Sequence, residues 1–173
     1  MRRVSLTSLV DVVASSGSPK VTKVRALKKQ NAEDYQTAHD YYKNLRDAIV
    51  DLHKKRLDKT ALSKVPDGVH RTKVANYTVA VRGYKKWLGR KQAEWFSPPK
   101  AVLSAGGISV SINPELGLKI GDNEHVVKLY FKADDLSKSK ANLVLAAMEM
   151  KLRSKVSAGC YMTVVDVRRG KHY

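Results

Sequence analysis

Residues 108–132 read ISVSINPELGLKIGDNEHVVKLYFK, and this stretch decides the expected fold. Apolar and polar residues alternate within 108–112, 116–120 and 125–132, which is the two-residue period of half-buried β-strands. Asn113-Pro114-Glu115 and Gly121-Asp122-Asn123 separate these segments with residue types that favour tight turns. The stretch therefore predicts three consecutive strands that pair as an antiparallel meander.

The residues after the meander predict one helix and one further strand. Asp134 and Asp135 suit the start of a helix, because carboxylates are favourable near helix N-termini, and apolar residues then continue to Leu152. Residues 162–167 form a last apolar run of strand length. The order of elements in this half is β-β-β-α-β. The whole chain is expected to be an α+β protein with a helical N-terminal half.

Two helices are expected before the meander. Apolar residues recur at steps of three and four from Tyr35 to Leu52, with Asp34 as the cap, and again from Val74 to Leu88. In the second helix, three cations lie four residues apart on a face beside the apolar stripe: Arg82, Lys86 and Arg90. One face of this helix is therefore expected to pack and another to be cationic.

Composition divides the chain into three regions. Residues 1–31 are expected to be a basic arm with a short amphipathic helix over 4–13, which polar residues distinguish from an export signal. Residues 32–96 form a helical basic region, and residues 97–173 form the α+β region. Ser97-Pro98-Pro99 marks the last boundary, because it cannot lie inside a helix. We expect the helices and the α+β region to pack together as one domain.

The net charge predicts the partner. The chain holds 33 Lys and Arg against 16 Asp and Glu, an excess of +17 in 173 residues, and residues 1–100 carry +13 of it. Self-repulsion on this scale is relieved by a polyanion, so we expect the protein to bind DNA or RNA. No recognition helix or zinc finger is visible, which predicts phosphate contacts with little sequence preference.

Two basic segments are the expected contacts. In the first, cations alternate with aromatic residues, and Trp87 is interpreted either as a base-stacking side chain or as part of the core. The second lies in the basic arm and is expected to order when it binds. The candidate nucleic-acid-binding residues are Arg82, Lys85, Lys86, Trp87, Arg90 and Lys91 in the first segment and Lys20, Lys23, Arg25, Lys28 and Lys29 in the second.

Other chemistry finds little support in the sequence. Cys160 is the single cysteine, which rules out an internal disulfide and a CxxC pair and favours a cytoplasmic protein. The five histidines lack metal-ligand spacing, and no glycine-rich phosphate loop is present, so we expect no metal site and no cofactor. No apolar run approaches the length of a membrane span.

The expected order of elements, with Pro114-Glu115 at the second strand and Lys128 on the third, resembles the core of the PD-(D/E)XK nuclease superfamily over residues 74–168. The resemblance implies a divalent metal such as Mg²⁺ held by two carboxylates, with a lysine that helps to activate water. It implies Glu115, one of Asp122 or Glu124, and Lys128 as the catalytic residues. Val126 stands where the family has an acid.

Three interpretations of the function follow. The first is a nucleic-acid-binding protein in which Pro114-Glu115 is an ordinary turn and Lys128 an exposed strand residue. The second is a PD-(D/E)XK-like nuclease, either active or degenerate. The third is a structural component of a nucleoprotein or viral assembly. The sequence favours the first and leaves open DNA or RNA, single or double strands, and the oligomeric state.

Overall fold

The computed structural model describes residues 2–15, 22, 25, 40–105 and 108–173. Its strands form two sheets, one of three strands in the order β1-β4-β3 and one of five strands in the order β2-β5-β6-β7-β8. The elements before the sheets are α1 (Leu6–Val13), α3 (Lys43–Lys54), the 3-10 helix η2 (Lys59–Gly68) and α4 (Arg71–Leu88). The strands are β1 (Arg2–Ser5), β2 (Ala93–Phe96), β3 (Ala101–Ala105), β4 (Ile108–Ile112), β5 (Leu116–Ile120), β6 (Asn123–Tyr130), β7 (Tyr161–Asp166) and β8 (Lys171–His172), with α5 (Lys138–Leu152) and the short η3 (Arg153–Lys155) between β6 and β7.

The protein is α+β, but the predicted three-stranded antiparallel meander and the β-β-β-α-β order are wrong. β4 does not pair with β5: it pairs antiparallel with β3 and parallel with β1 in the smaller sheet. The segment Asn113-Pro114-Glu115 is therefore a crossing between sheets instead of a hairpin turn. In the larger sheet, β5 pairs with β2 and β6, and β6 runs parallel to β7.

Two strands were missed because their sequences carry weak signals. β2 has only four residues, three of the five residues of β3 are Ala or Ser, and both strands flank Ser97-Pro98-Pro99, which is typical of a boundary. β1 and β8 were missed as well, because Val4 and Ser5 were expected inside the helix over 4–13 and Lys171–His172 is only two residues long. That helix exists as α1, and its Leu6 and Val10 are buried in the core.

The helices begin and end near the predicted places, with two differences. α3 begins at Lys43, and the cap expected at Asp34 lies outside the described residues. α5 begins at Lys138, where the Ser137 side chain accepts a hydrogen bond from the Lys140 amide at 3.3 Å. Asp135, expected near that start, instead forms an ion pair with Arg169. A serine competes well for the cap position because its side chain is short enough to reach the free amides.

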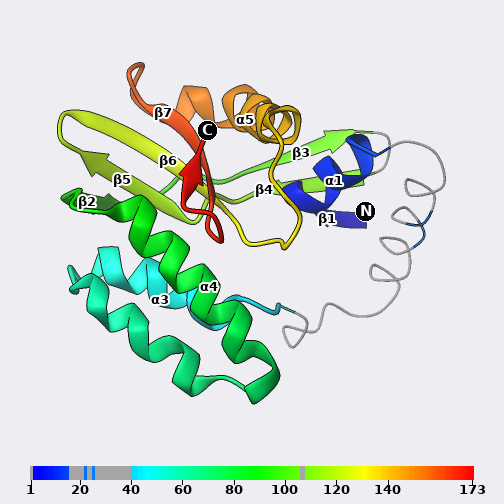
Figure 1. The fold of residues 1–173 in the computed structure, drawn as a ribbon. Coiled ribbons are helices and arrows are strands. Elements are labelled where there is room, and N and C mark those ends of the chain that lie inside the picture. Colours follow the sequence, from blue (N-terminus) through cyan, green and yellow to red (C-terminus); the bar gives the residue numbers. More distant parts are fainter. Residues whose placement is uncertain (1, 16–21, 23–24, 26–39, 106–107) are drawn as a thin grey trace.

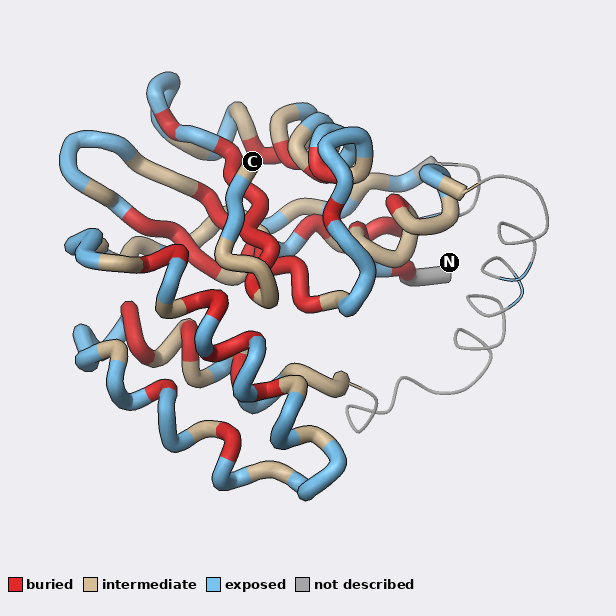
Figure 2. The backbone as a smooth tube through the Cα atoms, viewed as in Figure 1, coloured by how far each residue is buried: buried red, intermediate tan, exposed pale blue. Residues whose placement is uncertain are grey.

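Two hydrophobic cores lie on opposite faces of the five-stranded sheet. Figure 1 shows α3 and α4 on one face, with α5, α1 and the smaller sheet on the other. Leu118, Leu129 and Val165 point from the sheet into the first core, against Tyr77 and Tyr84 of α4. The second core lies between α5 and both sheets. Figure 2 shows the buried positions of α4 facing the sheet and the exposed ones facing away.

Gly83 allows α4 to lie directly against the turn between β7 and β8. A Cβ atom at this position would lie 2.0 Å from the carbonyl oxygen of Val167 and 2.7 Å from that of Arg168. Both contacts are with backbone, which has little freedom to move away. The absence of a side chain at Gly83 therefore fixes how closely the helical layer and the larger sheet approach.

Candidate nucleic-acid interface

Positive charge gathers in residues 54–91, which run from the end of α3 through η2 to the turn after α4. This segment holds twelve basic and two acidic side chains, a net charge of +10 within the +17 of the chain. The structure describes every one of these residues, and of the twelve cations Lys55 alone forms a salt bridge, with Asp51 at 2.7 Å. We call residues 54–91 the cationic layer. The other eleven cations have no carboxylate of the described residues in salt-bridge contact, which leaves most of their charge for solvent or a partner to neutralise.

α4 carries part of this charge along its outer face. Tyr77 and Tyr84 hold the inner face in the core, so Arg71, Arg82 and Lys86 emerge on the opposite side, and all three are exposed. From Arg71 to Lys86 the helix rises about 22 Å. That length corresponds to roughly six nucleotides of one strand at about 3.4 Å each. The outer face of α4 is thus a cationic strip long enough to follow a phosphate backbone.

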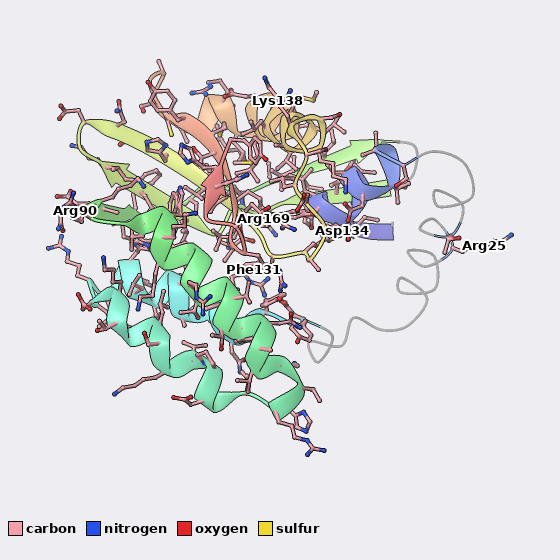
Figure 3. All side chains as sticks on the ribbon, viewed as in Figure 1. Arg25, Arg90, Phe131, Asp134, Lys138 and Arg169 are labelled. Atoms are coloured by element: carbon pink, nitrogen blue, oxygen red, sulfur yellow. The ribbon has the colours of Figure 1, made fainter. Side chains whose placement is uncertain are left out.

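Other cations of the layer lie around a pocket of about 570 Å³ at the C-terminal end of α4, which Asp58 and Glu94 also line. Four of them line it: Arg56, Lys59, Arg90 and Lys91. Lys59 donates to the carbonyl oxygen of Gly89 at 2.6 Å, and Lys91 donates to that of Trp87, so both neutralise the negative end of the α4 dipole. Arg56 and Arg90 are exposed at the rim. Figure 3 shows Arg90 beside β2, and Lys138 on the opposite side of the sheet at the start of α5.

Arg56 occupies a backbone conformation that favours glycine. It follows α3 with φ of +54°, and among the described residues it is the one non-glycine residue with positive φ. The amide of Leu57 donates to Leu52 at 2.8 Å and that of Arg56 to His53 at 3.2 Å, the hydrogen bonds of a helix stop that glycine usually completes. An arginine here costs on the order of 1 kcal/mol in backbone strain. The strain holds a guanidinium at the rim of the pocket.

The wall of the pocket that meets the core is uncharged. His53 is buried, and its Nε2 atom lies 2.6 Å from the hydroxyl of Tyr84. Burial lowers the pKa of His53 to about 4 and raises the pKa of Tyr84 well above its usual range. Both groups are therefore neutral at pH 7. The positive charge of this pocket therefore comes from the cations at its rim and not from the wall that meets the core.

The predicted contact residues differ in their exposure and in their partners. Arg82, Lys86 and Arg90 are exposed, Lys91 is exposed but bound to Trp87, and Lys85 is half-buried and donates to Ser63 at 3.0 Å. In the basic arm, Arg25 is exposed, whereas Lys20, Lys23, Lys28 and Lys29 lie outside the described residues.

The structure decides between the two interpretations of Trp87, as a base-stacking side chain or as part of the core. The Trp87 side chain is 5% exposed and packs against Tyr84 with ring centroids 5.4 Å apart, while the Lys91 ammonium covers its ring at the same separation. It therefore belongs to the core and is unavailable for stacking on a base. Sequence reasoning also missed Arg56, Lys59 and Arg71. Lys54-Lys55-Arg56 is a run of cations in the sequence, but cations at the end of a helix are also expected from the helix dipole alone.

The residues implied by the nuclease resemblance fall at two separate places. The Lys128 ammonium lies 2.5 Å from one carboxylate oxygen of Glu115, and the amide of Leu129 donates to the other at 2.8 Å. Both side chains of this ion pair are nearly buried, at 13% and 10% exposure. The carboxylate is thus occupied by partners that belong to the fold.

Asp122 and Glu124 lie at the other end of the β5–β6 hairpin. Glu124 of β6 lies opposite Lys119 of β5. Lys119 is four residues from Glu115, so the two acids are separated by about 13 Å along the strand. The Glu124 carboxylate accepts a hydrogen bond from Ser157 at 2.6 Å. Within the described ranges no group of three or more His, Cys, Asp or Glu side chains is placed to hold a metal ion. The structure brings Glu115 and Lys128 together and keeps the other two acids apart from them.

Comparisons with known proteins identify no relative. No protein-family model, curated protein or solved structure gives a significant match to this chain. Among the helices of the described residues, none combines the length and apolar character needed to cross a bilayer.

Proposed function

We propose that this protein binds nucleic acid by setting the cationic layer against the phosphate backbone. The observation that carries the proposal is the net charge of +10 in residues 54–91, where Lys55 alone of twelve described cations has a carboxylate partner. Binding releases counterions from the phosphates, and the gain grows with the number of cations that reach them.

The proposal includes little sequence preference. Base edges are read by polar side chains that project into a groove, whereas phosphate contacts fix position without reading sequence. Between Arg71 and Arg82, the exposed residues of α4 offer two hydroxyls, and both have partners within the fold: Thr72 lies 2.9 Å from His70 Nδ1, and Thr78 donates to the Val74 carbonyl at 2.9 Å. Affinity should therefore depend on charge and strand geometry. A cytoplasmic setting is also part of the proposal, supported by the lone and buried Cys160.

The test compares two triple charge reversals of equal size. Arg82→Glu, Lys86→Glu and Arg90→Glu remove three exposed cations from the cationic layer. Lys100→Glu, Lys119→Glu and Lys138→Glu remove three exposed cations that also lack salt bridges within the described chain, but lie outside the layer. Fluorescence anisotropy with a labelled 20-base-pair duplex and a 20-nucleotide single strand measures Kd for each.

We expect the first triple variant to bind about tenfold or more weakly, because it loses phosphate contacts and adds repulsion. The second should stay within about twofold of the wild type, because it removes no cation of residues 54–91 and therefore none of the proposed phosphate contacts. An equal loss of affinity in the two triple variants would show that only the net charge matters and would contradict the proposed interface. A wild-type protein that binds neither probe would overturn the proposed function and would favour a component that acts only inside an assembly.

A plasmid incubated with Mg²⁺ or Mn²⁺ separates binding from cleavage. We expect retarded but intact plasmid, because the acid that would complete a metal site with Glu115 lies about 13 Å away. Nicking by the wild type that disappears in Glu115→Ala would instead favour the nuclease interpretation.

A further inference from the structure

A row of side chains crosses the face of the larger sheet that α3 and α4 cover. In strand register, Trp95 of β2 pairs with Leu118 of β5, Leu118 pairs with His125 of β6, and His125 pairs with Tyr161 of β7. Paired residues point to the same face of a sheet. Leu118 is buried beneath the helices, but the row emerges from the core at its β7 end. There Tyr161 is 53% exposed.

Tyr161 and His125 form a fixed stack at this end of the row. Their ring centroids are 5.2 Å apart and their planes differ by 22°. The Nδ1 atom of His125 lies 3.1 Å from the Thr163 hydroxyl, which holds the imidazole in place. Burial lowers the pKa of His125, and the nearby His172 lowers it further, so the ring is neutral at pH 7. One face of Tyr161 is thus backed by a rigid neutral ring while half of its surface stays in solvent.

The stack is linked to the cationic layer through β8. The larger sheet places His172 of β8 opposite Val165 of β7, on the same face as Tyr161. The turn that leads into β8 lies against α4, because a Cβ atom at Gly170 would be 3.2 Å from the Lys86 side chain. Figure 1 shows β8 between α4 and the rest of β7. This contact lies beside the C-terminal end of β7, and Tyr161 at the other end is about 17 Å away along the strand. A single strand that leaves α4 at Lys86 would reach Tyr161 over β8 in about five nucleotides.

We infer that Tyr161, backed by His125, is a stacking platform for an unpaired base, which makes single-stranded nucleic acid the preferred ligand. This inference rests on the proposed function, because it needs the cationic layer to hold the backbone. An aromatic ring held in solvent gains by stacking on a base, whatever the base is. The bases of a duplex are already stacked on one another and are not available to it.

The experiment uses single-stranded and duplex probes with the full chain. Tyr161→Ala removes the ring, and Tyr161→Phe keeps it. Met150→Ala is a matched control, because Met150 is 70% exposed on α5, on the other side of the sheet. The probes are 12-nucleotide oligo(dT) with a central 2-aminopurine, the corresponding oligo(U), and a DNA hairpin with 12 base pairs. Anisotropy gives affinity, and quenching of 2-aminopurine reports stacking.

We expect Tyr161→Ala to weaken binding of the single strands about tenfold and to abolish the quenching. Hairpin binding should stay within about twofold, and Tyr161→Phe and Met150→Ala should match the wild type. A loss confined to oligo(dT) or to oligo(U) supports the platform and identifies its natural strand. The melting temperature of Tyr161→Ala should be unchanged, since its side chain is half in solvent.

Two outcomes would overturn the platform. One is unchanged affinity of Tyr161→Ala for the single strands; the other is an equal loss for single strands and hairpin. In either case, weakening by the triple reversal of Arg82, Lys86 and Arg90 would leave the proposed function standing. A wild type that binds none of the probes would remove the proposed function and the platform together.

Discussion

The cationic layer and the sheet region that follows it use the same kinds of residue for different purposes. Residues 54–91 hold twelve basic and two acidic side chains, whereas residues 92–173 hold twelve basic and eight acidic ones. In the sheet region, five of the twelve cations form salt bridges, including the nearly buried pair of Lys128 and Glu115. In the cationic layer, one described cation does. Nearly half of the cations in the sheet region are therefore paired inside the fold, whereas all but one of the described cations in the cationic layer are not.

Removing a matched charge should have the largest effect on stability. In Glu115→Ala the Lys128 ammonium stays nearly buried without its partner, and the Leu129 amide loses its acceptor. We expect a loss of about 3–5 kcal/mol in the free energy of unfolding, measured by urea denaturation. Asp47→Ala breaks the exposed pair with Lys43 and should cost about 0.5 kcal/mol or less. Equal costs for the two variants would mean that the Glu115 pair is not structural.

The contact that joins the two regions should give the next largest effect. Gly83→Ala forces a Cβ atom against the Val167 carbonyl, so α4 must move away from the sheet. We expect a loss of about 3 kcal/mol in urea unfolding. Gly68→Ala, in open space at the end of η2, should change stability by about 0.5 kcal/mol or less. If Gly83→Ala is as mild as Gly68→Ala, the two regions are not in the close contact described above.

The third prediction concerns how the stability of the fold depends on pH through His53, which is buried beneath the cationic layer. His53 has a pKa of about 4 in the folded protein, below its usual 6.5, so the unfolded chain binds the proton more readily. Its contribution to stability is complete above about pH 6.5 and falls as the pH drops towards 4, by up to about 3 kcal/mol. His53→Gln should flatten this part of the stability profile. A wild-type profile that matches the variant between pH 4 and 6.5 would contradict the burial of His53.

Arg56 should give the smallest change in stability, and one of opposite sign. Arg56→Gly relieves the backbone at φ of +54° and should stabilise the fold by about 1 kcal/mol. The same change removes a cation from the pocket rim and should weaken nucleic-acid binding a few-fold, as measured by anisotropy. Arg56→Lys keeps the charge and the strain, so it should leave both quantities near those of the wild type. A glycine variant that is more stable and binds equally well would remove Arg56 from the interface.

Elements with a clear local periodicity could be predicted from the sequence, whereas strand pairings could not. The alternation in 108–132 located β4, β5 and most of β6, and helical spacing located α4 with Arg82 and Lys86 on its exposed face. Both follow from local periodicity. The partners of β4 could not be predicted, because β1 and β3 lie far along the chain or carry weak strand signals and the pairing is set by packing.

Only part of the candidate site could be predicted from the sequence. The gathering of charge is a property of sequence, whereas the pocket at the end of α4 depends on how α3 ends. Arg56 was missed because its place at the pocket rim depends on the tertiary arrangement of α3 and α4. Trp87 lies at the edge of the apolar stripe, where spacing does not separate core from surface. Tyr161 and His125 are 36 residues apart and meet only through the parallel pairing of β6 and β7.

The dependence of affinity on salt tests the central claim most directly. For binding of a DNA duplex, log K falls with log salt concentration by about 0.9 for each phosphate contact. We predict that the triple reversal of Arg82, Lys86 and Arg90 flattens the wild-type slope by about 2 to 3, and that the triple reversal of Lys100, Lys119 and Lys138 leaves it unchanged. Equal slopes for the wild type and both variants would show that the unmatched cations of residues 54–91 do not meet phosphates.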